Sequence, residues 1–258
     1  MTRCLFLLVL SVAFASFAQT TPVLIPVFYN GPGQFGSEWF TAVNISNFTT
    51  QTVQGHGLRF IDRACPIPEG CETGDIAPNA FGSVAGPATV SGFLLHIPAA
   101  QASRFELDAR FGERTRNRYG VELPIAREND FRQAPGVVLP FVALRGFADG
   151  LRTTLRIYSP DAIAGQRVTV EIGTWGTRNT LASSVVTLAL SDPPGTAAPL
   201  RPAYAQLDLQ QAFPAIFAGS VTVRVIPLPS QDGATPRIWA FATAVRNDNN
   251  EVAVFSPR

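Results

Sequence analysis

Apolar residues alternate with polar ones over short runs along most of the chain, and clusters of Gly, Pro, Asn and Asp separate these runs. Val168, Val170 and Ile172 form one such run, and Val43 and Ile45 belong to another. Alternation with a period of two is the pattern of a β-strand with one buried face. Helical periodicity is almost missing, so the sequence predicts an all-β fold of antiparallel strands joined by tight turns.

Two long segments of the chain occur twice. Trp39–Asn47 matches Leu151–Ser159 in its apolar and small positions, and Ala109–Pro124 matches Ala242–Pro257. Each member of the second pair is a strand, a polar turn and a strand that ends in Pro. The segment Phe131–Gly136 contains Pro and Gly and is typical of a linker between two such units. With about seven short strands per unit, we predict two tandem antiparallel β-sandwich domains, over residues 22–130 and 137–258.

The first 18 residues are predicted to be a signal peptide rather than part of the fold. Residues 1–4 carry one positive charge, residues 5–15 form an apolar run, and small residues stand at Ser16 and Ala18. This order of features predicts cleavage after Ala18 and export of the rest of the chain. No later stretch approaches 18 consecutive apolar residues, so no membrane span is expected.

Several segments of the second unit are similar to a known kind of module. They are the strand Arg152–Pro160, the closing segment Trp239–Ala242 and the turn Asn247–Asn250. Together with the opening Leu-Pro strand, this pattern resembles the tandem immunoglobulin-like modules of secreted proteins from bacteria with GC-rich genomes. The resemblance implies an immunoglobulin-like fold and a secreted, periplasmic or cell-surface location, and it implies no biochemical activity.

The charge balance excludes two classes of partner. All 20 basic residues are Arg, and removal of Arg3 with the signal peptide leaves 19 of them against 19 Asp and Glu. A mature chain with a formal charge of zero has no excess of cations for the phosphates of nucleic acid or for an anionic membrane surface. We therefore expect neither as the main partner.

The mature chain keeps two cysteines, Cys65 and Cys71, which lie six positions apart around two prolines. In an oxidising compartment such a pair is expected to form a disulfide that closes one small loop. A zinc site would need two more ligands, and His56 is the nearest histidine. We predict the disulfide rather than the metal site.

No catalytic site, metal site or cofactor is predicted. The only histidines are His56 and His96, and His96 is expected to be a packed residue of an apolar strand. No Gly-x-Ser-x-Gly motif is present, and the acidic residues are spread along the chain, so that pairs of carboxylates are expected by chance. Trp39 is in phase with Val43 and Ile45 and is expected in the core.

Two features are candidates for ligand binding. Arg110, Arg114, Arg116 and Arg118 would project from one face of a strand if the strand continues, and guanidinium groups suit carboxylates or sulfates. The same charges could instead protect an exposed hairpin from aggregation. Trp175 lies in a turn-like Gly-Thr-Trp-Gly-Thr segment and could stack on a sugar ring.

These observations favour a secreted or periplasmic, non-enzymatic protein that acts in cell-surface binding, adhesion or assembly. Its partner would be an extracellular glycan or a surface protein. The alternative is a carbohydrate-active protein, either a glycan-binding module or a weak glycoside hydrolase.

Overall fold

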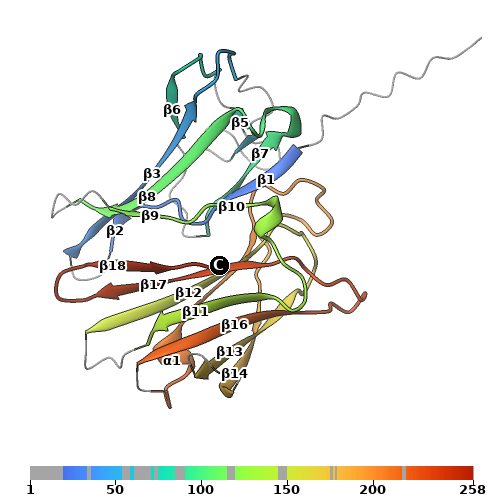
Figure 1. Cartoon of the computed structure of the whole chain (residues 1–258). Helices are drawn as coiled ribbons and strands as arrows, with labels where there is room; N and C mark the ends of the chain where they lie inside the picture. Colours follow the sequence, from blue (N-terminus) through green and yellow to red (C-terminus); the bar gives the residue numbers. More distant parts are fainter. Residues whose placement is uncertain are drawn as a thin grey trace, which may run out of the picture.

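The part of the chain that the structure describes forms four small antiparallel sheets (Figure 1). The computed structural model describes residues 20–33, 36–53, 59–60, 71–72, 75–84, 91–114, 120–144, 150–174, 177, 179–216 and 219–257. Within these residues the regular elements are strands, apart from the short helix α1 (Leu209–Ala212) and short turns of 3-10 helix. The predicted all-β fold of antiparallel strands is confirmed. No helix in this described part is long and apolar enough to cross a membrane.

The first half of the chain supplies two of the sheets, and we name each sheet after one of its central strands. The β1 sheet contains, in spatial order, β10 (Ala126–Arg127), β1 (Thr20–Ile25), β7 (Phe93–Pro98), β4 (Arg59–Phe60) and β5 (Cys71–Glu72). The β3 sheet contains β2 (Asn30–Pro32), β3 (Glu38–Asn47), β8 (Phe105–Glu113) and β9 (Val121–Glu122), and β6 (Phe81–Val84) also pairs with β3.

The second half supplies the other two sheets. The β12 sheet contains β15 (Ala203–Asp208), β12 (Leu151–Ser159), β17 (Trp239–Arg246) and β18 (Val252–Phe255). The β13 sheet contains β11 (Val137–Ala143), β16 (Ser220–Leu228), β13 (Arg167–Thr174) and β14 (Thr180–Thr187).

The repeated segments of the sequence form corresponding strands. Trp39–Asn47 lies in β3 and Leu151–Ser159 forms β12, and each of these strands pairs with the first strand of a following hairpin. The hairpin is β8-β9 beside β3 and β17-β18 beside β12. The two halves therefore share the strand orders β3-β8-β9 and β12-β17-β18.

One hydrophobic core lies between the β12 and β13 sheets. Val168, Val170 and Ile172 of β13 are fully buried there, as the alternating pattern predicts. Leu155 and Ile157 of β12 enter the same core from the opposite sheet. Burying such side chains contributes roughly 1.5–3 kcal/mol each, so the alternating pattern fixes which face of each strand points inward.

The other core is shared by the two halves of the chain. It joins aliphatic residues of the β1 and β3 sheets to Tyr158, Trp239 and Phe241. These three aromatic residues belong to the β12 sheet and alternate with the residues that fill the first core, so the β12 sheet is covered on both faces. The arrangement of the four sheets is thus closer to a propeller than to two separate immunoglobulin-like sandwiches. The prediction of two such sandwiches is therefore wrong.

The segment predicted as a linker is tied to the second half. Arg132 and Ile238 exchange two backbone hydrogen bonds, both of 2.8 Å. Next to them, the Arg237 guanidinium donates to Asp161 Oδ1 at 2.7 Å and also pairs with Glu128. Because Glu128 precedes the segment and Asp161 follows it, this ion-pair network holds the two halves together at the point where they join.

Gly92 occupies a position that alanine cannot take without a clash. Its φ is +67°, and a Cβ there would lie 2.2 Å from the backbone oxygen of Ile25. Gly165 has a similar φ of +62°, but a Cβ there meets nothing within 4 Å. We expect Gly165→Ala to lower the free energy of unfolding by about 1 kcal/mol through backbone strain alone, and Gly92→Ala to lower it by about 3 kcal/mol. Urea denaturation of both variants measures the difference, and equal losses would contradict the close approach at Gly92.

Candidate functional site

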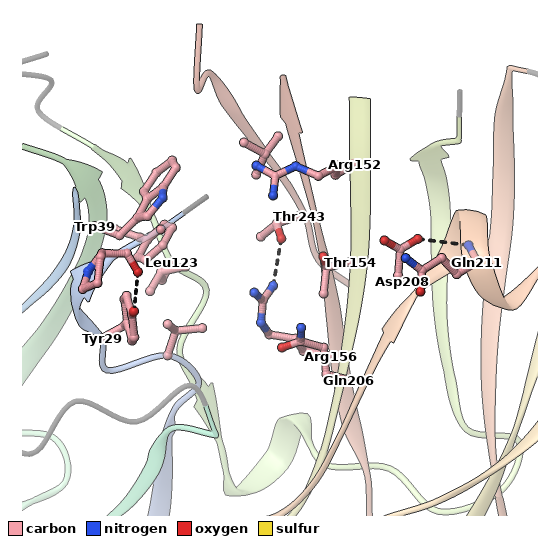
Figure 2. Close-up of a pocket in the computed structure, with 15 residues that line it drawn as sticks. Tyr29, Trp39, Leu123, Arg152, Thr154, Arg156, Gln206, Asp208, Gln211 and Thr243 are labelled. Carbon is pink, nitrogen blue, oxygen red and sulfur yellow. Dashed lines mark hydrogen bonds between the residues drawn. The ribbon is translucent and has the colours of Figure 1, made fainter. Parts of the chain in front are cut away.

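A cleft of about 400 Å³ separates the β3 sheet from the outer face of the β12 sheet. Figure 2 shows Tyr29 and Trp39 on one side of it and Arg152 and Arg156 on the other. Its volume lies within the range of about 300–1,000 Å³ that is typical of small-molecule sites. The cleft is therefore large enough to hold a small ligand or part of a longer one.

Alternation along β12 creates the polar wall of the cleft. Leu155 and Ile157 point into the core, so the residues between and before them, Arg152, Thr154 and Arg156, face the other way. Tyr158 lies further along the same face of β12, and there the first half of the chain covers it. The outer face of the β12 sheet is thus apolar and buried at one end, and polar and open at the other.

Arg156 is held in place by its neighbours. Its Nη1 donates to Thr243 Oγ1 at 2.8 Å, and its guanidinium carbon lies 5.7 Å from the centre of the Phe241 ring. The Nε atom is buried and has no hydrogen-bond partner among the described residues. Because a buried donor without a partner costs about 1–3 kcal/mol, this atom marks a place where a ligand or an ordered water would be stabilised.

The second guanidinium, Arg152, lies at the mouth of the polar wall. Its Nε donates to Asn247 Oδ1 at 2.5 Å, from the turn between β17 and β18. Burial lowers the pKa of Arg152, and the negative charge of Asp208 partly opposes that shift. Asp208 itself caps α1 by accepting a hydrogen bond from the backbone nitrogen of Gln211 at 3.0 Å. The charged groups of the described lining are thus two guanidiniums and one carboxylate, which already accepts a hydrogen bond.

The opposite wall is aromatic and rigid. The rings of Trp39 and Phe111 stack with their centres 4.9 Å apart and their planes 2° from parallel. Trp39 Nε1 donates to Ser37 Oγ at 2.8 Å, and the Tyr29 hydroxyl donates to the backbone oxygen of Pro32 at 2.6 Å. Trp39 is buried, which confirms the prediction that it belongs to the interior, and it also contributes to the cleft.

The described lining of the cleft contains few groups that can act as acids or bases. Among the described residues around the cleft there is one carboxylate, Asp208, and there is no histidine or cysteine. Glycoside hydrolysis by the common mechanisms needs two carboxylates on either side of the scissile bond. Elsewhere, His96 is buried, and its Nε2 lies 2.6 Å from the backbone oxygen of Pro199, as expected of a packed residue. Within the described residues no three His, Cys, Asp or Glu side chains are grouped so that they could hold a metal ion.

The predicted arginine stripe lies away from the cleft where the structure describes it. Arg110 is exposed and pairs with Asp108 at 3.2 Å, and it alternates with Phe111, whose ring faces the cleft. The Arg114 guanidinium carbon lies 5.4 Å from the centre of the Phe40 ring. Arg116 and Arg118 lie outside the described residues, so a common face for the four arginines stays a prediction.

Two other predicted features also fall outside what the structure describes. Trp175 is one, and its stacking on a sugar ring stays a prediction. Cys65 is the other, and for Cys71 the structure gives the backbone of β5 but no description of the side chain. The disulfide therefore stays a prediction as well.

Arg152 and Arg156 were not predicted as binding residues, although the strand pattern around them resembles the one around the predicted arginine stripe. Arg156 lies between Leu155 and Ile157 on a predicted strand, as Arg110 lies between Ala109 and Phe111. Alternation shows that such residues face away from their own core, but it does not show whether they meet solvent or another sheet. The cleft forms only because the first half of the chain covers part of that face.

Comparison with known proteins gives no relative from which a function could be transferred. No family model matches the chain, and no curated protein or solved structure is similar to it. The cleft between the β3 and β12 sheets brings charged, neutral polar and aromatic side chains together.

Proposed function

We propose that this protein is a secreted or periplasmic, non-enzymatic binding protein that acts at the cell surface and holds its ligand in the cleft between the β3 and β12 sheets. The location follows from the predicted signal peptide. The observation that carries the proposal is the pairing of two guanidiniums, Arg152 and Arg156, with the stacked rings of Trp39 and Phe111 across one cleft.

A ligand of this cleft would join an anionic group to a flat, weakly polar face. Guanidinium groups bind anions through several parallel N–H donors, and aromatic faces stack on apolar or ring surfaces. The alternative activity, a weak glycoside hydrolase, is less well supported because Asp208 is the one carboxylate among the described lining residues and its oxygen already caps α1. The glycan-binding form of that alternative is compatible with the same cleft.

Thr154→Trp tests the proposal because it fills the cleft without removing a charge. Thr154 lies on the cleft face of the central strand β12, so an indole ring there would occupy the space between the two walls. We expect this variant to bind any ligand at least about 100-fold more weakly than the wild type, a loss of about 3 kcal/mol. A panel of immobilised neutral and acidic glycans and surface proteins, probed with the full chain, measures the change.

Thr169→Trp is the matched control for that experiment. Thr169 is also a half-buried residue of a central strand, but it lies on β13, outside the cleft. It should bind as the wild type does. Equal binding by the Thr154→Trp variant and the wild type would place the binding surface elsewhere and would contradict the proposed role of the cleft.

A further inference from the structure

We infer that the ligand of this cleft is an acidic saccharide, a chain of pyranose rings that carry carboxylates, as in uronic acids. This inference rests on the proposed binding function and names its ligand class. It follows from three properties of the cleft: an incompletely bonded guanidinium, a flat aromatic wall and neutral hydrogen-bonding groups between them.

The guanidinium of Arg156 is suited to a carboxylate. Its Nη1 donates to Thr243 and the guanidinium also interacts with the Tyr204 hydroxyl, while its buried Nε has no partner among the described residues. A carboxylate is planar and needs two donors in its own plane, which one edge of a guanidinium supplies. A sulfate group has three outward oxygens and would need further donors around it. Arg152, on the same face of β12, can meet a second carboxylate or the outer oxygen of the first.

The aromatic wall is suited to the face of a pyranose ring. Trp39 and Phe111 stack on one another with their planes 2° from parallel, and one hydrogen bond to Ser37 holds the Trp39 ring in its orientation. Sugar rings present C–H groups on one face, and these pack on aromatic rings much as other apolar surfaces do. An extended aromatic ligand could use the same wall, but it would leave the polar groups around it without partners.

Neutral polar groups between the two walls are suited to the hydroxyls of a sugar. The side chains of Thr154, Gln206 and Gln211 line the cleft. Gln206 Oε1 accepts a hydrogen bond from the Tyr204 hydroxyl at 2.6 Å, so its amide nitrogen is oriented as a donor. Burial raises the pKa of Tyr204 despite the nearby Arg156 guanidinium, so the phenol keeps its proton and this orientation. Hydroxyl groups of a ring can both donate to and accept from such a set.

The test compares an oligogalacturonate with the same oligosaccharide in its methyl-esterified form. Esterification removes the negative charge and leaves the ring, the linkage and the hydroxyls unchanged. Calorimetric titration of the full chain should show binding of the acid form and binding of the ester that is at least 10-fold weaker. Arg156→Gln should weaken binding of the acid form by about 10- to 100-fold, which is the usual effect of losing a hydrogen bond between charged groups.

The controls separate this inference from the proposed function. Arg167 is an exposed arginine of β13, outside the cleft, and Arg167→Gln should change binding less than twofold. Equal binding of acid and ester, abolished by Thr154→Trp, would overturn the inference while the cleft remains a binding site. Binding that Thr154→Trp leaves intact would overturn the proposed function itself.

Two further outcomes also decide against an acidic saccharide. The first is that neither the oligogalacturonate nor an oligomannuronate, whose rings differ from it in configuration at C2 and C4, binds the wild type at millimolar concentration. The second is displacement of the bound oligosaccharide by sulfated dextran at an equal concentration of charged groups, because this would show a general anion site without preference for carboxylates.

Discussion

Tyr158→Ala is expected to lower the free energy of unfolding by about 3–5 kcal/mol, the usual cost of truncating a buried aromatic residue to alanine. Tyr158 is fully buried, and its ring packs on Trp239 and Phe241 and on Tyr204. Its hydroxyl donates to the backbone oxygen of Pro26, which lies in the first half of the chain. The substitution therefore removes packing within the second half and a hydrogen bond between the halves.

Two measurements separate these contributions. Tyr158→Phe keeps the ring and leaves the Pro26 oxygen without its donor, so it should cost about 1–2 kcal/mol. Burial raises the pKa of Tyr158 well above its ordinary value, so the stability that its neutral hydroxyl provides is present below about pH 10 and is lost as the pH rises further. Urea denaturation at neutral and alkaline pH should show this loss in the wild type and a smaller one in Tyr158→Phe. Two independent unfolding transitions would contradict the shared core.

Asn47→Ala is expected to have an effect of similar size, about 3 kcal/mol, although it removes few atoms. Asn47 is fully buried at the end of β3. Its Nδ2 donates to the backbone oxygens of Gln51, Ile76 and Ala77 at 2.8–3.0 Å. Each of these oxygens keeps one other donor, so alanine removes three hydrogen bonds without leaving an unpaired group, at a net cost of about 1 kcal/mol each.

Thr49→Ala provides the graded control for Asn47. The Asn47 Oδ1 accepts hydrogen bonds from the backbone nitrogen and the hydroxyl of Thr49, at 3.0 and 2.8 Å. Removing the hydroxyl leaves the amide donors of Asn47 in place and should cost about 1 kcal/mol. Equal losses in the two variants, measured by urea denaturation, would show that the amide is not what holds this loop to residues 76–77.

The sequence predicted the strands better than their assembly. Val168, Val170 and Ile172 alternate with polar residues, and a period of two leaves little choice of buried face. The same argument correctly places Leu155 and Ile157 in a core. It does not place Tyr158, because whether the outer face of a strand is covered depends on where another sheet lies.

The cleft is hidden from sequence analysis for the same reason. Arg152 and Arg156 follow one another at a spacing of four along β12, whereas Trp39 and Phe111 come from two strands of the first half. These residues become neighbours only when the β3 sheet meets the outer face of the β12 sheet. Sequence periodicity shows which face of a strand a residue lies on, but not which other sheet that face meets. It therefore gives no reason to prefer Arg152 and Arg156 over the arginines of residues 110–118.

The most direct test of the proposed cleft follows the Nε–H signal of Arg156 by nuclear magnetic resonance. Arg156 lines the cleft and this Nε–H has no partner among the described residues, so a carboxylate that binds the guanidinium would change its signal. Addition of oligogalacturonate should shift the Arg156 signal and slow its exchange with water, while the signal of Arg167 on β13 stays unchanged. Shifts confined to Arg110 and Arg114, with Arg156 unaffected, would contradict a binding site between the β3 and β12 sheets.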